Sequence, residues 1–69
     1  MKLDDFLAGI AILRTHTEND YPLDANHDEI LFSIDSDKFP LTFGEMRKLS
    51  VYGWGKWQRG EADVWLAYT

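Results

Sequence analysis

One short stretch of the chain has the spacing of a metal-binding loop. "DANHDEILFSID", residues 24–35, carries acids or an amide at its first, third, fifth and twelfth positions. An EF-hand calcium loop has ligands at these positions, but it needs glycine at the sixth position and a bidentate Glu at the twelfth. Here Glu29 is sixth and Asp35 is twelfth, and residues 29–34 have the pattern of a strand. We therefore predict no calcium site, and no other metal or cofactor.

The two histidines suggest an alternative site for a transition metal. His16 and His27 would bind it together with Asp24 or Asp28. Two histidines at this separation across a loop do not have a recognised ligand spacing. We expect both to be ordinary surface residues.

Catalysis has little support in the sequence. Hydrolysis needs paired carboxylates in a shielded cleft, or a nucleophile beside a base. The Ser and Thr residues form no such motif, and a chain of 69 residues has little room for a pocket. We predict that the protein is not an enzyme.

The acidic residues are concentrated in one third of the chain. Seven acids and no Lys or Arg lie between Thr15 and Asp37, and the net charge is −5. Such a segment repels nucleic acid and lipid headgroups and can steer toward a basic protein surface. The alternative interpretation is a solvated acidic loop that keeps a small protein soluble.

The composition indicates a single small domain with an aromatic core. There is no cysteine, which excludes disulfides and thiol chemistry, while three Trp, three Tyr and four Phe can fill a core. The apolar segment 6–13 is too short to span a bilayer, and it follows acids where a signal peptide has positive charge. We expect a cytoplasmic protein that does not enter the membrane.

Hydrophobic periodicity predicts five elements. They are a helix over 3–14, an acidic loop over 15–28, a strand over 29–34, a helix over 43–52 and a hairpin over 54–68 with its turn in 59–62. The residues expected on the buried face of the first helix are Leu3, Phe6, Leu7, Ile10 and Leu13. The predicted fold is α+β, in the order α-β-α-β-β, with two helices packed on a three-stranded, mainly antiparallel sheet.

The second helix has the clearest local signals. Thr42 and Glu45 are spaced for a capping box, and Leu41 and Met46 for a hydrophobic staple. Gly53 follows as a C-terminal stop.

Three binding functions remain open. Trp54 and Trp57, among the bases Arg47, Lys48, Lys56 and Arg59, have the composition of a single-stranded nucleic-acid platform, although the net negative charge opposes it. Self-association through an edge strand or an exposed Trp is a second hypothesis. The third is protein binding, because carboxylates beside an edge strand over 29–34 would offer both backbone pairing and an imitation of DNA phosphates.

The pattern "LTFGEMRKLSVYGW", followed by a hairpin ending in "VWLAYT", resembles very small phage and prophage proteins of mostly unassigned function. "DEIL", residues 28–31, is also similar to the Glu-Ser-Ile edge-strand segment of a family of uracil-DNA glycosylase inhibitors, but it lacks the intervening Ser. The resemblance implies an inhibitor of a host DNA-processing or defence enzyme. Its partner would be a host protein with a basic nucleic-acid-binding surface, and the inhibitor itself a monomer or homodimer.

The leading prediction is therefore a phage-encoded, DNA-mimicking inhibitor, with uracil-DNA glycosylase as the first candidate target. Carboxylates would form the charged track, and Ile30 or Leu31 would be the apolar anchor. The predicted partner-binding residues are Asp24, His27, Asp28, Glu29, Ile30, Leu31, Asp35 and Asp37.

Overall fold

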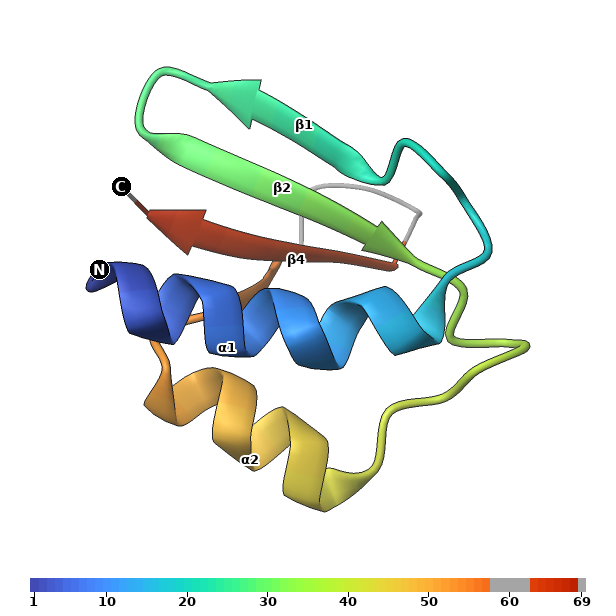
Figure 1. Cartoon of the computed structure of the whole chain (residues 1–69). Helices are drawn as coiled ribbons and strands as arrows, with labels where there is room; N and C mark the ends of the chain where they lie inside the picture. Colours follow the sequence, from blue (N-terminus) through green and yellow to red (C-terminus); the bar gives the residue numbers. More distant parts are fainter. Residues whose placement is uncertain (58–62, 69) are drawn as a thin grey trace.

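The computed structural model describes residues 1–57 and 63–68, apart from the side chains of Asn26 and Trp57 (Figure 1). In this part of the chain, two helices lie on one side of a four-stranded antiparallel sheet with strand order β1-β2-β4-β3. The elements are α1 (Leu3–Leu13), the 3₁₀ turn η1 (Arg14–His16), β1 (Leu23–Asn26), β2 (Glu29–Ile34), α2 (Phe43–Val51), β3 (Gly55–Trp57) and β4 (Asp63–Tyr68). The α+β class is confirmed.

The sheet has one strand more than predicted. β1 lies within the segment expected to be an acidic loop, and it pairs with β2 from Leu23 opposite Phe32 to Asn26 opposite Glu29. The observed order of helices and strands is therefore α-β-β-α-β-β. Asp and Asn have low intrinsic strand preference, so this strand depends on pairing with β2 rather than on its own composition.

The predicted C-terminal hairpin also pairs. β3 is antiparallel to β4, from Gly55 opposite Leu66 to Trp57 opposite Val64. The predicted turn at 59–62 lies outside the described residues.

The buried face of α1 is rotated relative to the prediction. Gly9 and Leu13 are buried, whereas Leu3 is 70% and Leu7 is 52% exposed. The prediction was wrong for both exposed leucines. The helix turns a glycine toward the core because another side chain occupies the space where a larger residue would lie.

That side chain is Trp54, which follows α2. Its ring is 2% exposed and stacks on Phe6 with 5.6 Å between ring centroids. A Cβ on Gly9 would lie 2.0 Å from the Trp54 Nε1 atom. Gly9 therefore allows α1 and the indole to pack in direct contact.

The boundaries of α2 follow the sequence signals. The Glu45 amide donates to the Thr42 hydroxyl, and the Thr42 amide donates to the Glu45 carboxylate, so the capping box is confirmed. At the other end, Gly53 has φ +92°, and the Trp54 amide donates to the Leu49 carbonyl. These bonds satisfy groups that a helix end leaves unpaired.

The sheet has a different apolar cluster on each face. Phe32 and Ile34 of β2 and Trp65 and Ala67 of β4 pack with Leu13, Leu49 and Trp54 on the helix side. Leu31, Val64 and Leu66 form a second cluster, and their alternation with the first group places them on the opposite face.

Neither described helix is long and apolar enough to cross a membrane.

Candidate functional site

The β1–β2 hairpin brings together half of the predicted partner-binding residues. The four residues at this end of the hairpin are Asp24, His27, Asp28 and Glu29, with His27 and Asp28 forming the connection between the paired residues Asn26 and Glu29. Asp24, His27 and Asp28 are exposed, and Glu29 is half-buried. This end of the hairpin, residues 24–29, is called the acidic tip below.

The other predicted acids lie elsewhere. Asp35 and Asp37 follow the opposite end of β2. At 3.3 Å per residue, the strand separates Asp28 from Asp35 by about 20 Å. The predicted acids therefore form two groups rather than one continuous track.

The predicted apolar anchors belong mainly to the fold. Leu31 is 7% exposed and packs with Val64 and Leu66. Ile30 is half-buried against the helix-side core. Leu31 is therefore not available as an exposed anchor for a partner.

β1, rather than β2, is the edge strand on this side of the sheet, and β3 is the edge strand on the other side. β2 pairs with β1 on one side and with β4 on the other, which contradicts its expected place at the edge. The Ser33 amide donates to the Pro22 carbonyl at 2.9 Å. Because main-chain groups alternate in direction along an antiparallel strand, Asp24 turns its main-chain groups toward β2, while Leu23 and Ala25 turn theirs outward.

Asp24 partly protects this edge. Its Oδ1 accepts a hydrogen bond from the outward-facing Ala25 amide at 2.9 Å. Short edge strands with charged side chains are a common protection against uncontrolled strand pairing. The Leu23 amide and both outward carbonyls remain on the edge.

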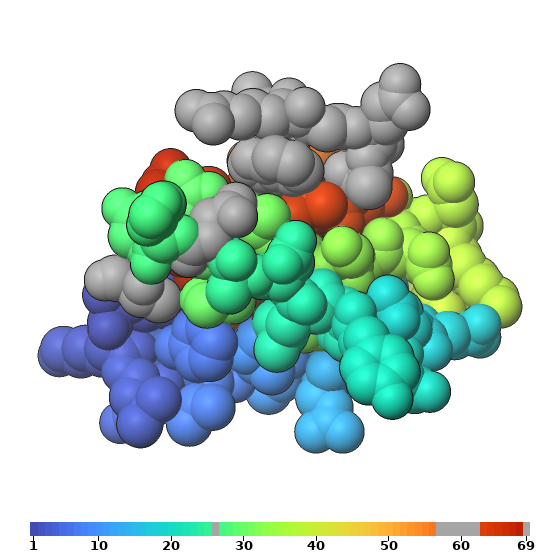
Figure 2. Space-filling view, turned by 90° about the horizontal axis from the view of Figure 1, so that it is seen from above, coloured from blue at the N-terminus to red at the C-terminus, as the bar shows by residue number. Residues whose placement is uncertain are grey.

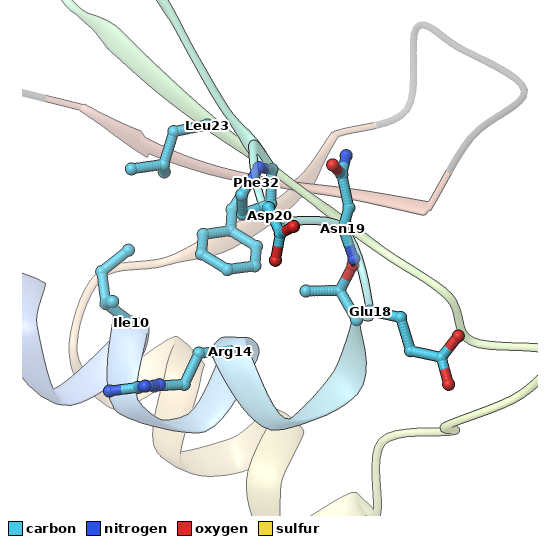
Figure 3. A pocket seen from close by; sticks show the side chains of 9 residues that line it. Ile10, Arg14, Glu18, Asn19, Asp20, Leu23 and Phe32 are labelled. Atoms are coloured by element: carbon cyan, nitrogen blue, oxygen red, sulfur yellow. The ribbon is translucent and has the colours of Figure 1, made fainter.

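A hollow of about 410 Å³ opens between α1 and β1. Ile10, Leu23 and Phe32 provide its apolar surface, and Arg14, Glu18 and Asp20 are among its polar lining. Figure 3 shows Ile10 and Arg14 extending from α1 on one side of this hollow, with Leu23 across from them. A second hollow of about 320 Å³ is lined by Met1, Leu3, Phe6 and Ile30. Neither hollow was expected from the sequence, because the residues that line each one come from separate segments.

The acidic tip has no cation of its own in the part of the chain that is described. The ion pairs found among the described residues lie outside the acidic tip. They join Glu18 to Lys38 at 2.9 Å and Glu45 to His16 at 2.8 Å. Both side chains of the Glu18–Lys38 pair are solvent-exposed, so this ion pair adds little to the stability of the fold. Among residues 1–57 and 63–68, the carboxylates of the acidic tip therefore have no intramolecular ion pair.

His16 is part of the folded interior, so the prediction that it is a surface residue was wrong. It is buried, with its Nδ1 atom 2.7 Å from the Phe39 carbonyl and its Nε2 atom 2.8 Å from the Glu45 carboxylate. Burial lowers the pKa of His16, but the hydrogen bonds to Glu45 and Phe39 outweigh it and raise the pKa above 6.5. Both contacts are acceptors and so favour the protonated ring, which joins η1 to the start of α2.

The alternative metal site is not assembled. His27 is at the exposed acidic tip, whereas His16 is engaged with Glu45. Across residues 1–57 and 63–68, no three His, Cys, Asp or Glu side chains are grouped to hold a metal ion.

The proposed nucleic-acid platform loses one of its two rings. Trp54 is buried in the core and cannot stack on a base. Arg47, Lys48 and Lys56 are exposed. The Trp57 side chain and Arg59 lie outside the described residues.

The chain matches no family model, and searches of curated proteins and of solved structures return no match.

Proposed function

We propose that this protein is a non-enzymatic module that binds a basic surface of another protein through its acidic tip. The observation that carries the proposal is that Asp24, Asp28 and Glu29 have no intramolecular cation partner among the described residues. A hairpin of fixed register holds them, so little ordering of the backbone is needed on binding.

The spacing of the carboxylates supports the imitation of a nucleic-acid backbone. Asp24 and Glu29 lie on the same face of the sheet, because Asp24 pairs with Leu31 and Glu29 is two residues away. Such diagonal neighbours are about 7–8 Å apart at their Cα atoms. Two negative charges at a fixed separation on a rigid hairpin offer a basic cleft the same type of contact as successive phosphates.

The more specific proposal concerns the partner. A host DNA-processing or defence enzyme has a basic cleft of this kind, and occupying the cleft would inhibit the enzyme. The similarity of residues 28–31 to a uracil-DNA glycosylase inhibitor segment makes that enzyme the first target to test. The protein would then be phage-encoded and would act in the host cytoplasm.

The test is a pull-down from bacterial lysate with three versions of the protein. They are the wild type, the double variant Asp28→Asn/Glu29→Gln, and the matched control Asp35→Asn/Asp37→Asn, which loses the same charge at the other end of β2. We expect the wild type and the control to capture one nucleic-acid enzyme, and the acidic-tip variant to lose it. Capture should also weaken with salt.

Purified uracil-DNA glycosylase gives the direct assay. Inhibition by the wild type and the control, but not by the acidic-tip variant, is the expected result. Equal losses of capture in both double variants would mean that only net charge matters, and the acidic tip would no longer be the site.

A further inference from the structure

One flank of α1, continued by Arg14 of η1, carries two exposed leucines and the half-buried Ile10. At 3.6 residues per turn, Leu3, Leu7, Ile10 and Arg14 share this flank. Leu3 is 70% and Leu7 is 52% exposed, although both were expected in the core. These four residues are called the α1 flank below.

The α1 flank faces the hairpin. Leu3 lines the smaller hollow together with Ile30, while Ile10 and Arg14 line the larger one together with Leu23. Figure 2 shows the green-blue residues of the hairpin alongside the blue residues of α1 on the same side of the molecule. The free edge of β1 therefore runs beside two hollows, of which the smaller is lined by apolar side chains and the larger by apolar and charged ones.

Side chains of β1 alternate across this edge. Leu23 and Ala25 pair with Phe32 and Ile30, so they lie on the helix side of the sheet. Asp24 lies on the opposite side. A strand added beside β1 would follow the same alternation, with every second side chain directed toward the α1 flank.

We propose that the edge of β1 receives a strand from the partner, in which apolar residues alternate with Lys or Arg. The apolar residues lie on the α1 flank and over the two hollows, and the basic residues lie beside Asp24. This proposal rests on the proposed function and specifies how the basic partner is bound. It is an instance of recognition by β-strand addition.

The charges select this occupant. Ile10, Leu23 and Phe32 give an inward-pointing side chain apolar contacts, and the one cation of the larger hollow, Arg14, is accompanied there by Glu18 and Asp20. Asp24 and the acidic tip, in contrast, attract a basic side chain that points outward. A second copy of the chain is a poor occupant, because each copy has a net charge of −5 and antiparallel pairing of two β1 strands would bring like charges together.

The geometry also sets the length of the added strand. From Leu3 to Arg14 the α1 flank is about 17 Å long at 1.5 Å per residue. An extended segment covers this distance with about five residues. During binding the Ala25 amide exchanges its bond to the Asp24 carboxylate for a carbonyl of the partner, which releases the carboxylate to meet a base.

The experiment uses two synthetic peptides of identical composition, labelled for fluorescence anisotropy. One alternates Lys and Val (KVKVKVK), and the other separates them into blocks (KKKKVVV). We expect the alternating peptide to bind at least tenfold more tightly, because only it places apolar and basic side chains on opposite sides of a strand. Binding should slow hydrogen exchange of the Leu23 and Ala25 amides.

Three variants locate the contact. Ala25→Pro removes an amide that points away from β2, so the β1–β2 hydrogen bonds are retained while strand addition is blocked. Leu7→Gln alters the exposed α1 flank without touching the edge. Val51→Gln, at an α2 residue that is 77% exposed, is the matched control. We expect about a tenfold loss for Ala25→Pro and a several-fold loss for Leu7→Gln, with no change for the control.

Failure of this inference is distinguishable from failure of the proposed function. Equal binding of both peptides, abolished by Asp28→Asn/Glu29→Gln, would overturn strand addition and leave charge-driven binding in place. Binding of neither peptide would also overturn it, while the lysate pull-down tests the acidic tip separately. Pairing with a second copy, detected as a dimer that excludes the alternating peptide, would overturn the assignment of the occupant.

Discussion

Gly9 determines how closely α1 approaches Trp54. An added Cβ would lie 2.0 Å from the indole Nε1 atom, so the ring, stacked on Phe6, must move. We predict that Gly9→Ala lowers the free energy of unfolding by about 1–3 kcal/mol, although Ala gains about 1 kcal/mol of helix propensity over Gly. Urea denaturation measures the change.

Gly44 provides the matched control for this substitution. It lies in the first turn of α2, where the nearest atom to an added Cβ is 3.8 Å away. Gly44→Ala should leave stability unchanged or raise it slightly. If Gly9→Ala also proved neutral, the contact with Trp54 would not restrict the approach of α1.

His16 and Glu45 give the fold a pH dependence. The raised pKa of His16 contributes stability that is complete below its ordinary value of 6.5 and is lost as pH rises through its value in the folded state. The pKa of Glu45 is lowered, first by the Thr42 amide and then by the His16 ring, so its contribution is lost as pH falls below 4.5 through the folded value. The pair therefore stabilises the fold most between pH 4.5 and 6.5.

Glu45→Gln tests this pair while keeping the capping box, since Gln can make the same bond to the helix start. In the wild type, the free energy of unfolding should fall as pH rises beyond 6.5. The variant should show a flatter profile between pH 5 and 8, because the charge that holds the imidazolium is gone. Parallel profiles for the two proteins would contradict the assigned role of His16.

At the scale of elements, α2 depends on its N-terminal cap. The Thr42 hydroxyl accepts the Glu45 amide, and the helix has only nine residues over which to offset a loss. We predict that Thr42→Ala lowers the free energy of unfolding by about 1 kcal/mol. Thr42→Ser keeps the hydroxyl and should cost only a few tenths of that. Equal effects of Ala and Ser in thermal or urea unfolding would show that the cap does not stabilise α2.

The sequence predicts best those elements, such as α2, whose ends are determined by residues close together in the chain. Thr42, Glu45 and Gly53 lie within one helix and specify its ends without tertiary contacts. β1 was missed because its sequence favours turns and the strand forms only against β2. The face of α1 was misplaced because apolar spacing gives weight to Leu3 and Leu7, whereas the fold turns Gly9 toward the core, in contact with Trp54.

The candidate site shows the same division. Residue types identified the acids at 24, 28 and 29, because charge is visible without a fold. The separation of Asp35 from the acidic tip and the burial of Leu31 depend on strand pairing, which cannot be derived from the sequence alone. The exposed α1 flank was not predicted either, because its leucines were expected to be buried.

For the whole molecule, charge decides between two modes of association. Exposed apolar side chains at Leu7 and Leu23 favour contact with a second copy, but a net charge of −5 opposes it. This repulsion is long-ranged at low ionic strength. The Debye length is about 30 Å at 0.01 M salt and falls to about 8 Å at 0.15 M. We therefore predict a monomer at low salt over the whole concentration range of a sedimentation experiment.

Salt and charge variants complete that measurement. If the apolar attraction between two copies is weaker than their charge repulsion, the wild type should stay monomeric or form only weak dimers when the salt is raised to 0.5 M. Leu7→Gln should remove any dimers that form. Asp24→Asn/Asp28→Asn should increase association if it occurs at β1, because the like charges at the paired edges are reduced. A stable dimer at low salt would instead favour self-association as the function, because apolar contact would then exceed the repulsion between two acidic chains.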